Sequence, residues 1–332
     1  LGLTYLNEHE IAGWHHHVTD GTVVDVCVVP EEKDDGVYLT ILRTINGQTR
    51  KFIERFAYRE FSDIKDAIFV DCSVSYDGRN TEESKQFGIF GGTTWEDSEL
   101  LSLIPADASV RISTDDIGAT FKLTGPDGES VRLTVTEYVP AIIDYLKGHT
   151  DKTVPASLRG VSTSKWERAI KTVKNLHHLE GKVVSALGDG GVLASPHFEN
   201  SQKTVVNGSV TFDDPAAVLH IGLPFVSDAK TLDMERVNGE TVIGKKKSVG
   251  KVIFRVEQSK GIFAGPEEPS DGVLEGLMEY KPPPYDVSNE PETGVVEIEI
   301  VPKWTDGGSV FIRQIDPLPL TILSVAPAGF IG

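Results

Sequence analysis

A run of three histidines at positions 15–17 contains the residues best suited to bind a metal ion. Alternate side chains of a β-strand share a face, so His15 and His17 could coordinate one ion together with an acidic third ligand. His9-Glu10 does not begin a metalloprotease motif, because the position of the second histidine is occupied by Gly13. Adjacent histidines equally suit the start of a strand, with one ring packed and the others hydrated. We therefore predict no metal site, and His15 and His17 are the only candidates.

Acidic residues occur in adjacent pairs, and paired carboxylates are the catalytic groups of many glycoside hydrolases. A glycoside hydrolase needs two carboxylates that face each other across a cleft, about 5–9 Å apart. Neighbours on one loop do not supply this geometry, so solvated loop charge is the better interpretation and we predict no catalytic residue. A polysaccharide-degrading enzyme stays open as an alternative, and it would need carboxylates from distant segments. The pairs are Glu31/Glu32, Asp34/Asp35, Glu96/Asp97, Asp115/Asp116, Asp213/Asp214 and Glu267/Glu268.

Other catalytic and cofactor-binding signatures are incomplete in this sequence. The glycine-rich stretch at 188–191 lacks the Lys-Ser/Thr pair and the helix of a phosphate-binding loop. The Gly-x-Ser-x-Gly turn that presents a nucleophilic serine in one class of hydrolases does not occur. We therefore predict that the protein is not an enzyme and binds no cofactor.

Two carboxylates near the C-terminal end alternate with apolar residues. Glu297 and Glu299 are interleaved with Ile298 and Ile300, which places both carboxylates on one face of a strand. Such a face either protects an exposed sheet from aggregation or lines an acidic passage. The sequence does not separate these two interpretations.

Exposed aromatic residues in a shallow groove would be the mark of a receptor- or carbohydrate-binding module. Trp95, Trp304 and Tyr285 are the first candidates for contact with a glycan. This binding module is the second alternative that the residues leave open.

Composition argues against a surface that grips nucleic acid. The 332 residues include 50 acidic and 32 basic side chains, which gives a net charge of −18. Phosphate binding needs clustered Lys and Arg, whereas an acidic lumen would let a duplex pass without adhering. Acidity that serves solubility alone fits the composition equally well. No stretch approaches the ~20 apolar residues of a transmembrane helix, so we predict no membrane insertion by this chain.

The two cysteines and the start of the chain give further expectations. Cys27 and Cys72 each lie in an apolar run, which predicts buried, reduced thiols. The chain begins at Leu1 without a methionine or a signal-peptide pattern, so we expect a fragment or a processed product.

The elements that carry these residues are predicted to be almost entirely β-strands. Asp-Gly occurs seven times and Asn-Gly three times, a turn density that favours an all-β, multi-domain fold. Three Val- and Thr-rich segments at 22–29, 37–43 and 48–55 predict an antiparallel meander, with Asn46-Gly47 as a type I′ turn. Only Asp25 is charged in the run 23–29, so both faces of this strand are expected to be buried.

We divide the chain into four parts on these patterns. Residues 1–79 form the meander, which resembles a propeller blade, and 80–150 form an inserted small β module. Residues 151–180 are a linker with a short amphipathic helix, and 181–332 form a C-terminal β domain. We expect sandwich or barrel domains with one or two short helices. The candidate helices are Pro140–Leu146 and Ser164–Leu179.

Several short motifs occur here in an order that resembles a known family. They are Gly13-Trp14-His15-His16-His17-Val18-Thr19-Asp20-Gly21, Arg43-Thr44-Ile45-Asn46-Gly47, Phe52-Ile53-Glu54-Arg55, His178-Leu179-Glu180-Gly181, Val206-Asn207-Gly208-Ser209 and His220-Ile221-Gly222-Leu223-Pro224-Phe225, followed by Asp316-Pro317-Leu318-Pro319. Together they resemble the C-terminal half of the tail tube or nozzle proteins (tail tubular protein B-like) of short-tailed bacteriophages. The resemblance covers about residues 1–79 and 176–325, and residues 80–150 match nothing in it.

The resemblance implies a structural role in a virion. It implies a hexameric ring of propeller-like and sandwich domains around a channel for DNA ejection, assembled in the bacterial host cytoplasm. The implied partners are adaptor and other tail proteins, tail fibres, and duplex DNA that passes without specific binding. Scaffold roles are implied for matching residues: Trp14 in the core, and Asn46-Gly47 and Asn207-Gly208 as turns. The unmatched module would be a fin or a receptor-facing domain.

Overall fold

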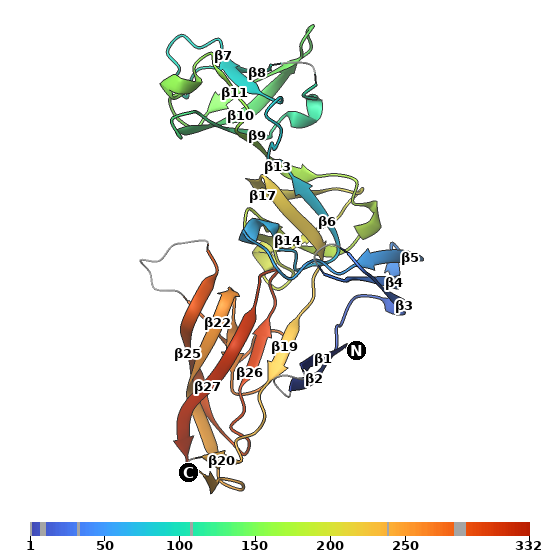
Figure 1. Ribbon diagram of the computed structural model, residues 1–332, viewed down its shortest axis with the longest axis vertical. Coiled ribbons are helices and arrows are strands. Elements are labelled where there is room, and N and C mark those ends of the chain that lie inside the picture. Colours follow the sequence, from blue (N-terminus) through green and yellow to red (C-terminus); the bar gives the residue numbers. More distant parts are fainter. Residues whose placement is uncertain (1, 7–10, 32–33, 107–108, 238, 282–289) are drawn as a thin grey trace. The chain divides into compact units, whose positions relative to one another are not determined.

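The structure is a computed structural model that describes residues 2–6, 11–31, 34–106, 109–237, 239–281 and 290–332 (Figure 1). It confirms the all-β, multi-domain fold class. The chain divides into two compact units. Unit 1 comprises 1–73, 178–204 and 221–332, and unit 2 comprises 74–177 and 205–220.

The N-terminal part of unit 1 contains a hairpin and a three-stranded meander. The hairpin consists of β1 (Gly2–Leu6) and β2 (Ile11–His15). The meander consists of β3 (Thr22–Val29), β4 (Gly36–Ile45) and β5 (Gln48–Arg55) in the order β3-β4-β5. Asn46 (φ 47°) and Gly47 (φ 72°) join β4 to β5, as the type I′ turn requires. The predicted meander and its turn are therefore confirmed.

A second sheet of unit 1 is built from segments far apart in the sequence. Its order is β15-β14-β18-β6, with β16 paired to β14. The strands β6 and β18 begin or end in unit 2, so the chain changes units within them. The five strands are β6 (Asp71–Asp77), β14 (Val183–Gly188), β15 (Gly191–Ala194), β16 (Lys203–Thr204) and β18 (Val218–Leu223).

The C-terminal part of unit 1 is a sandwich of two sheets. One sheet has the order β25-β22-β27 and the other β19-β26-β23-β24, and a separate pair is β20-β21. Val252 and Phe254 of β22 share a buried cluster with Ile298 of β25, Ala264 of β23 and Ile312 of β26, so the two sheets enclose one core. The strands are β19 (Ser227–Lys230), β20 (Arg236–Val237), β21 (Glu240–Thr241), β22 (Lys247–Ser259), β23 (Phe263–Gly265), β24 (Met278–Glu279), β25 (Glu292–Thr305), β26 (Phe311–Gln314) and β27 (Thr321–Ile331).

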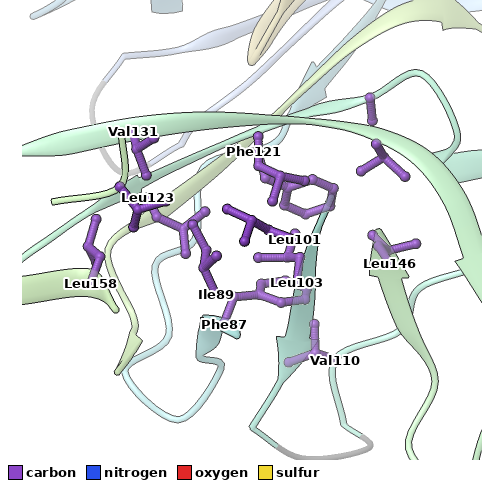
Figure 2. Packing of buried hydrophobic residues seen from close by; sticks show 14 residues of the cluster. Phe87, Ile89, Leu101, Leu103, Val110, Phe121, Leu123, Val131, Leu146 and Leu158 are labelled. Atoms are coloured by element: carbon purple, nitrogen blue, oxygen red, sulfur yellow. The ribbon is translucent and has the colours of Figure 1, made fainter. Parts of the chain in front are cut away.

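Unit 2 is built on one eight-stranded sheet in the order β12-β7-β8-β11-β10-β9-β13-β17. Its core is a cluster of 14 buried apolar residues, in which Phe87 and Phe121 lie edge to face with ring centroids 5.2 Å apart (Figure 2). The strands are β7 (Phe87–Phe90), β8 (Leu101–Pro105), β9 (Thr120–Thr124), β10 (Ser130–Val139), β11 (Tyr145–Thr150), β12 (Ser162–Thr163), β13 (Trp166–Val173) and β17 (Val210–Ala216).

The described residues contain short 3-10 turns and no α-helix. The turns are η2 (Ile64–Asp66), η3 (Thr114–Asp116), η4 (Ala156–Leu158), η5 (His177–Leu179) and η6 (Glu199–Ser201). Nothing helical in these parts of the chain has the length and hydrophobicity needed to cross a bilayer.

The predicted helix Ser164–Leu179 is wrong, because β13 occupies most of it. Trp166 and Ile170 are four residues apart, a spacing that places them on one face of a strand as well as of a helix. The register of β13 shifts between Ile170 and Thr172, and this irregularity brings Val173 into the buried set at an apparent helical spacing. Pairing with β9 on one edge and β17 on the other satisfies the backbone as a strand.

The second predicted helix, Pro140–Leu146, is wrong too. Pro140 follows the end of β10, residues 141–143 form a bend, and β11 begins at Tyr145. The Asp144 carboxylate accepts hydrogen bonds from the Ala141 N–H (3.0 Å) and the Tyr138 hydroxyl (2.6 Å), which holds the bend closed. The expected linker 151–180 thus contributes β12 and β13 to the sheet of unit 2.

Candidate interaction surface

The strand β3 lies exposed along its whole length. Every residue from Thr22 to Val29 is exposed, and its five valines show between 43% and 58% of their surface. The prediction that both faces of this strand are buried is therefore wrong for the isolated chain. Valine runs of this kind are typical of strands packed between other layers. In the single chain this run stays uncovered, so it forms an exposed apolar surface.

The strand register shows which face of the meander is apolar. Val23 pairs with Ile41 of β4, Val26 with Leu39, and Val28 with Val37. Partners opposite each other across strands share a face, and alternate residues along a strand do so as well. All six side chains therefore lie on one face.

The outer edge of β3 is also open. Within the described ranges, β3 pairs only with β4, and the other edge of the sheet is β5. An edge strand presents unpaired backbone N–H and C=O groups that can accept another strand. This edge carries a single charge, Asp25, whereas charged side chains commonly protect an exposed edge.

A buried ion pair joins β4 to β5 on the same face as these six side chains. Arg43 of β4 is 1% exposed, and its Nε and Nη2 donate to the two carboxylate oxygens of Glu54 at 2.6 and 2.7 Å. Its Nη1 donates to the backbone carbonyl of Asp20. Two parallel guanidinium–carboxylate bonds fix the relative orientation of β4 and β5.

A second ionic contact fastens the loop after β3. The Arg55 guanidinium at the end of β5 donates to Glu31, and the Tyr38 hydroxyl of β4 donates to the same carboxylate at 2.7 Å. The hydrogen bonds from Arg55 and Tyr38 lower the pKa of Glu31 to about 2. The surface is therefore carried on a fixed scaffold rather than on a free loop.

The two cysteines differ, contrary to the expectation that both are buried. Cys27 on β3 is exposed, and only Cys72 is buried. Burial and the nearby Glu54 raise the pKa of the Cys72 thiol to about 12. Cys27 thus reports on the accessibility of the face of β3 opposite Val26 and Val28.

The residues at the end of β2 are also more exposed than expected. Trp14 shows 71% of its surface, so its assignment to the core is wrong for this chain. The rings of His15 and His17 do meet, edge to face, with centroids 5.1 Å apart. Burial and the neighbouring His15 lower the pKa of His17. The described residues contain no group of three or more potential ligands that could hold a metal ion here.

The candidate glycan-contact residues are placed differently from one another. Trp95 is half-buried against the core of unit 2 and has the Arg159 guanidinium 6.0 Å from its ring. Trp304 at the end of β25 is 55% exposed. Tyr285 lies outside the described residues. Trp95 belongs to unit 2 and Trp304 to unit 1.

Glu297 and Glu299 do share the outward face of β25, as predicted. Both are exposed, while Val296, Ile298 and Ile300 between and beside them are buried. Lys251 of the neighbouring β22 forms an ion pair with Glu297, so this face is mixed in charge rather than purely acidic. Asn207 (φ 53°) and Gly208 (φ 66°) form the predicted turn.

Neither known family models nor curated proteins match this chain. The resemblance to the phage family therefore depends on the sequence motifs alone. Sequence reasoning found β3 as a strand and missed its exposure. The exposure could have been predicted from the size of the sheet, because a three-stranded meander cannot cover both of its faces by itself.

Proposed function

We propose that this protein is a structural subunit of the tail of a short-tailed bacteriophage, part of the nozzle or tail tube ring through which DNA is ejected. The observation that carries the proposal is the exposed, valine-rich face and edge of β3. The order of the sequence motifs described above supports the assignment to a phage tail. In this proposal the protein has no catalytic activity, and its site is an assembly surface.

The energetics of β3 favour burial by another protein surface. Burial of one Val side chain contributes about 1.5–3 kcal/mol at the upper limit of full transfer from water. Five valines that each expose 43–58% of their surface offer several kcal/mol in total before the entropy cost of association. A rigid sheet loses little entropy on binding, and the Arg43–Glu54 pair keeps this one rigid.

The partner in this proposal is another copy of the chain. The two edges of the meander are different, with apolar β3 on one side and β5, which exposes Arg50 and Lys51, on the other. Contact between unlike surfaces of successive copies generates a closed ring when the rotation between them closes. A six-fold ring with propeller-like stacking of meanders is the form that the family resemblance implies.

The remaining partners follow from the same setting. Adaptor and other tail proteins and tail fibres would contact the ring, and duplex DNA would pass through it. The net charge of −18 opposes adhesion of DNA to the channel. The protein would be located in the virion after assembly in the host cytoplasm.

Light scattering and negative-stain imaging over a range of concentrations test this proposal. The expected result is concentration-dependent assembly into a ring with a central hole wide enough for duplex DNA. The double variant Val26→Lys/Val28→Lys should prevent assembly, because it places two charges on the apolar face. The matched control Leu232→Lys replaces another exposed apolar residue of unit 1, 91% exposed, and should assemble normally.

Two results would overturn the proposal. One is a chain that stays monomeric at high concentration, alone and with other tail proteins. The other is a ring that forms unchanged in the Val26→Lys/Val28→Lys variant, which would place the contacts elsewhere.

A further inference from the structure

Unit 2 carries two adjoining hollows that no predicted role uses. Their volumes are about 490 and 210 Å³, and they share Val110, Arg111, Ile112 and Arg168 in their walls. The larger one is lined on its outer side by the bend at 141–144. The smaller one is lined by the segment 76–82 and by the aromatic rings of Phe87, Phe121 and Trp166.

The carboxylates of the larger hollow are already occupied. Asp116, which is 3% exposed, accepts the Ser113 N–H through one oxygen and the Arg168 Nη1 through the other, both at 2.7 Å. Asp144 accepts the Tyr138 hydroxyl and a backbone N–H of its own bend. A ligand that needs acceptors would have to compete with these bonds.

The carboxylates of the smaller hollow are occupied as well. Asp77 accepts two bonds from the Arg79 guanidinium, at 3.0 and 2.8 Å. Glu82 forms an ion pair with Lys85 at 2.7 Å. Four cationic side chains, counting the shared Arg111 and Arg168, face these two carboxylates.

The walls that the two hollows share therefore contain guanidinium N–H groups without a hydrogen-bond partner among the described residues. Within the described ranges, Arg111 is exposed and forms no hydrogen bond or ion pair. Arg168 uses Nη1 for Asp116 and Nε for the Tyr76 hydroxyl oxygen at 2.9 Å, which leaves its Nη2 without a bond to a described residue. Arg79, Lys85 and Arg168 each form an ion pair, so Arg111 is the one cation of the two hollows without an ion pair to a described residue. Asp144 keeps its negative charge, because only neutral donors among the described residues contact it.

We propose that this site binds the carboxylate of an acidic sugar, such as a uronic or sialic acid residue of a glycan, between Arg111 and Arg168. A carboxylate matches the one guanidinium that has no ion pair, whereas a phosphate monoester carries nearly two charges at neutral pH. The planar guanidinium of Arg111 suits two-point binding of a carboxylate.

The rest of the site suits the body of a sugar ring. Ile112, Ile142 and Ile143 flank the larger hollow and offer apolar contact to the C–H faces of a pyranose. The Ser113 hydroxyl is a further donor beside them. A wall of apolar side chains with a few polar groups is the usual composition of a small-molecule site.

Isothermal titration calorimetry with the full chain tests the site. Glucuronate and N-acetylneuraminate are the probes, glucose is the uncharged comparison, and glucose 6-phosphate tests the alternative source of negative charge. We expect at least one acid to bind, with an affinity that falls as NaCl is added. Glucose should not bind measurably.

Variants assign the binding to Arg111. Arg111→Ala should weaken the acid at least about tenfold, as loss of a charge-assisted hydrogen bond predicts, and Arg111→Lys should restore part of the affinity. The control Arg132→Ala removes another exposed arginine of unit 2, one that lies beside Asp151 at 3.7 Å, and should bind normally. Melting curves verify that each variant is folded.

Any of three results would overturn the proposal: no binding of either acid, equal binding by Arg111→Ala, or preference for glucose 6-phosphate. The site goes beyond the assembly role and does not depend on β3. A monomeric chain that binds the acid would reject the ring and keep the sugar site, and a ring without acid binding would do the reverse.

Discussion

Arg43 is the residue on which the meander depends most. Its guanidinium is buried, and its two bonds to Glu54 join β4 to β5 on the face that carries Val23, Val26 and Val28. Removing one partner of a buried ion pair leaves the other charged group without compensation, which costs far more than the net value of the pair.

We therefore predict that Arg43→Ala lowers the free energy of unfolding of the meander by about 3 kcal/mol. Arg50→Ala, which removes an exposed arginine paired with position 43 across the strands, should change it by less than about 0.5 kcal/mol. Urea denaturation of both variants measures the difference. Equal stability of the two would show that the Arg43–Glu54 pair contributes little.

Glu99 closes the loop before β8. Its carboxylate accepts the backbone N–H groups of Thr93, Thr94 and Trp95 at 2.6–3.0 Å, and these bonds lower its pKa from 4.5 to about 2. A lowered folded-state pKa means that the ionised form is favoured by folding. Its stabilisation is complete above the unfolded value of 4.5 and is lost as the pH falls toward 2.

We predict that an NMR titration of the Glu99 carboxyl carbon gives a midpoint near 2, and that the loop loosens between pH 4.5 and 2. Glu99→Gln should loosen the same loop at pH 7, where the wild type holds it closed. A midpoint near 4.5 would mean that the three N–H bonds are absent in solution.

At the scale of the element, close backbone approach decides where strands can pair. Gly148 of β11 faces β10 where the register of that pair shifts, and a Cβ at this glycine would lie 2.0 Å from the Thr134 carbonyl oxygen. Real Cβ atoms do not approach so closely, so any side chain must displace β10 or β11.

We predict that Gly148→Ala destabilises unit 2 by about 1–3 kcal/mol, the usual cost of overpacking. Gly250→Ala is the control, because Gly250 is also a strand glycine and its nearest contact would be the Pro302 Cβ at 3.9 Å. Thermal unfolding should show a lower midpoint for the first variant alone. A normal midpoint for Gly148→Ala would contradict the tight pairing of β10 with β11.

At the scale of the whole molecule, the uncovered β3 is the feature that a single chain does not explain. Whether β3 becomes covered can be measured with thiol reagents, which attack accessible thiolates. Cys27 on β3 is exposed, whereas Cys72 is buried. The pKa of about 12 and the burial of Cys72 protect that thiol.

We predict that a thiol reagent modifies Cys27 alone in the dispersed, folded chain, and that Cys27 becomes protected when rings form. Denatured protein should react at both cysteines, which provides the control. Full reactivity of Cys27 in an assembled ring would show that the face of β3 opposite Val26 and Val28 stays open in the ring.

Much of the fold was predictable because strand patterns and turns are local. The predicted segments 22–29 and 48–55 match β3 and β5. Asn46-Gly47 and Asn207-Gly208 have positive φ angles, which Asn and Gly tolerate better than other residues. The shared face of Glu297 and Glu299 was also predictable, because alternate residues of a strand point to the same side.

The sequence by itself determined the all-β class, most strand positions and the turns, since propensity and periodicity act over a few residues. Only the tertiary structure decided that 166–173 is a strand, because Trp166 and Ile170 fit one face of either element and strand pairing settles the choice. It also decided that β3 and Trp14 are exposed and that Arg111 and Arg168 line the same hollows. Burial and proximity depend on which distant segments pack together, and a local pattern does not contain that information.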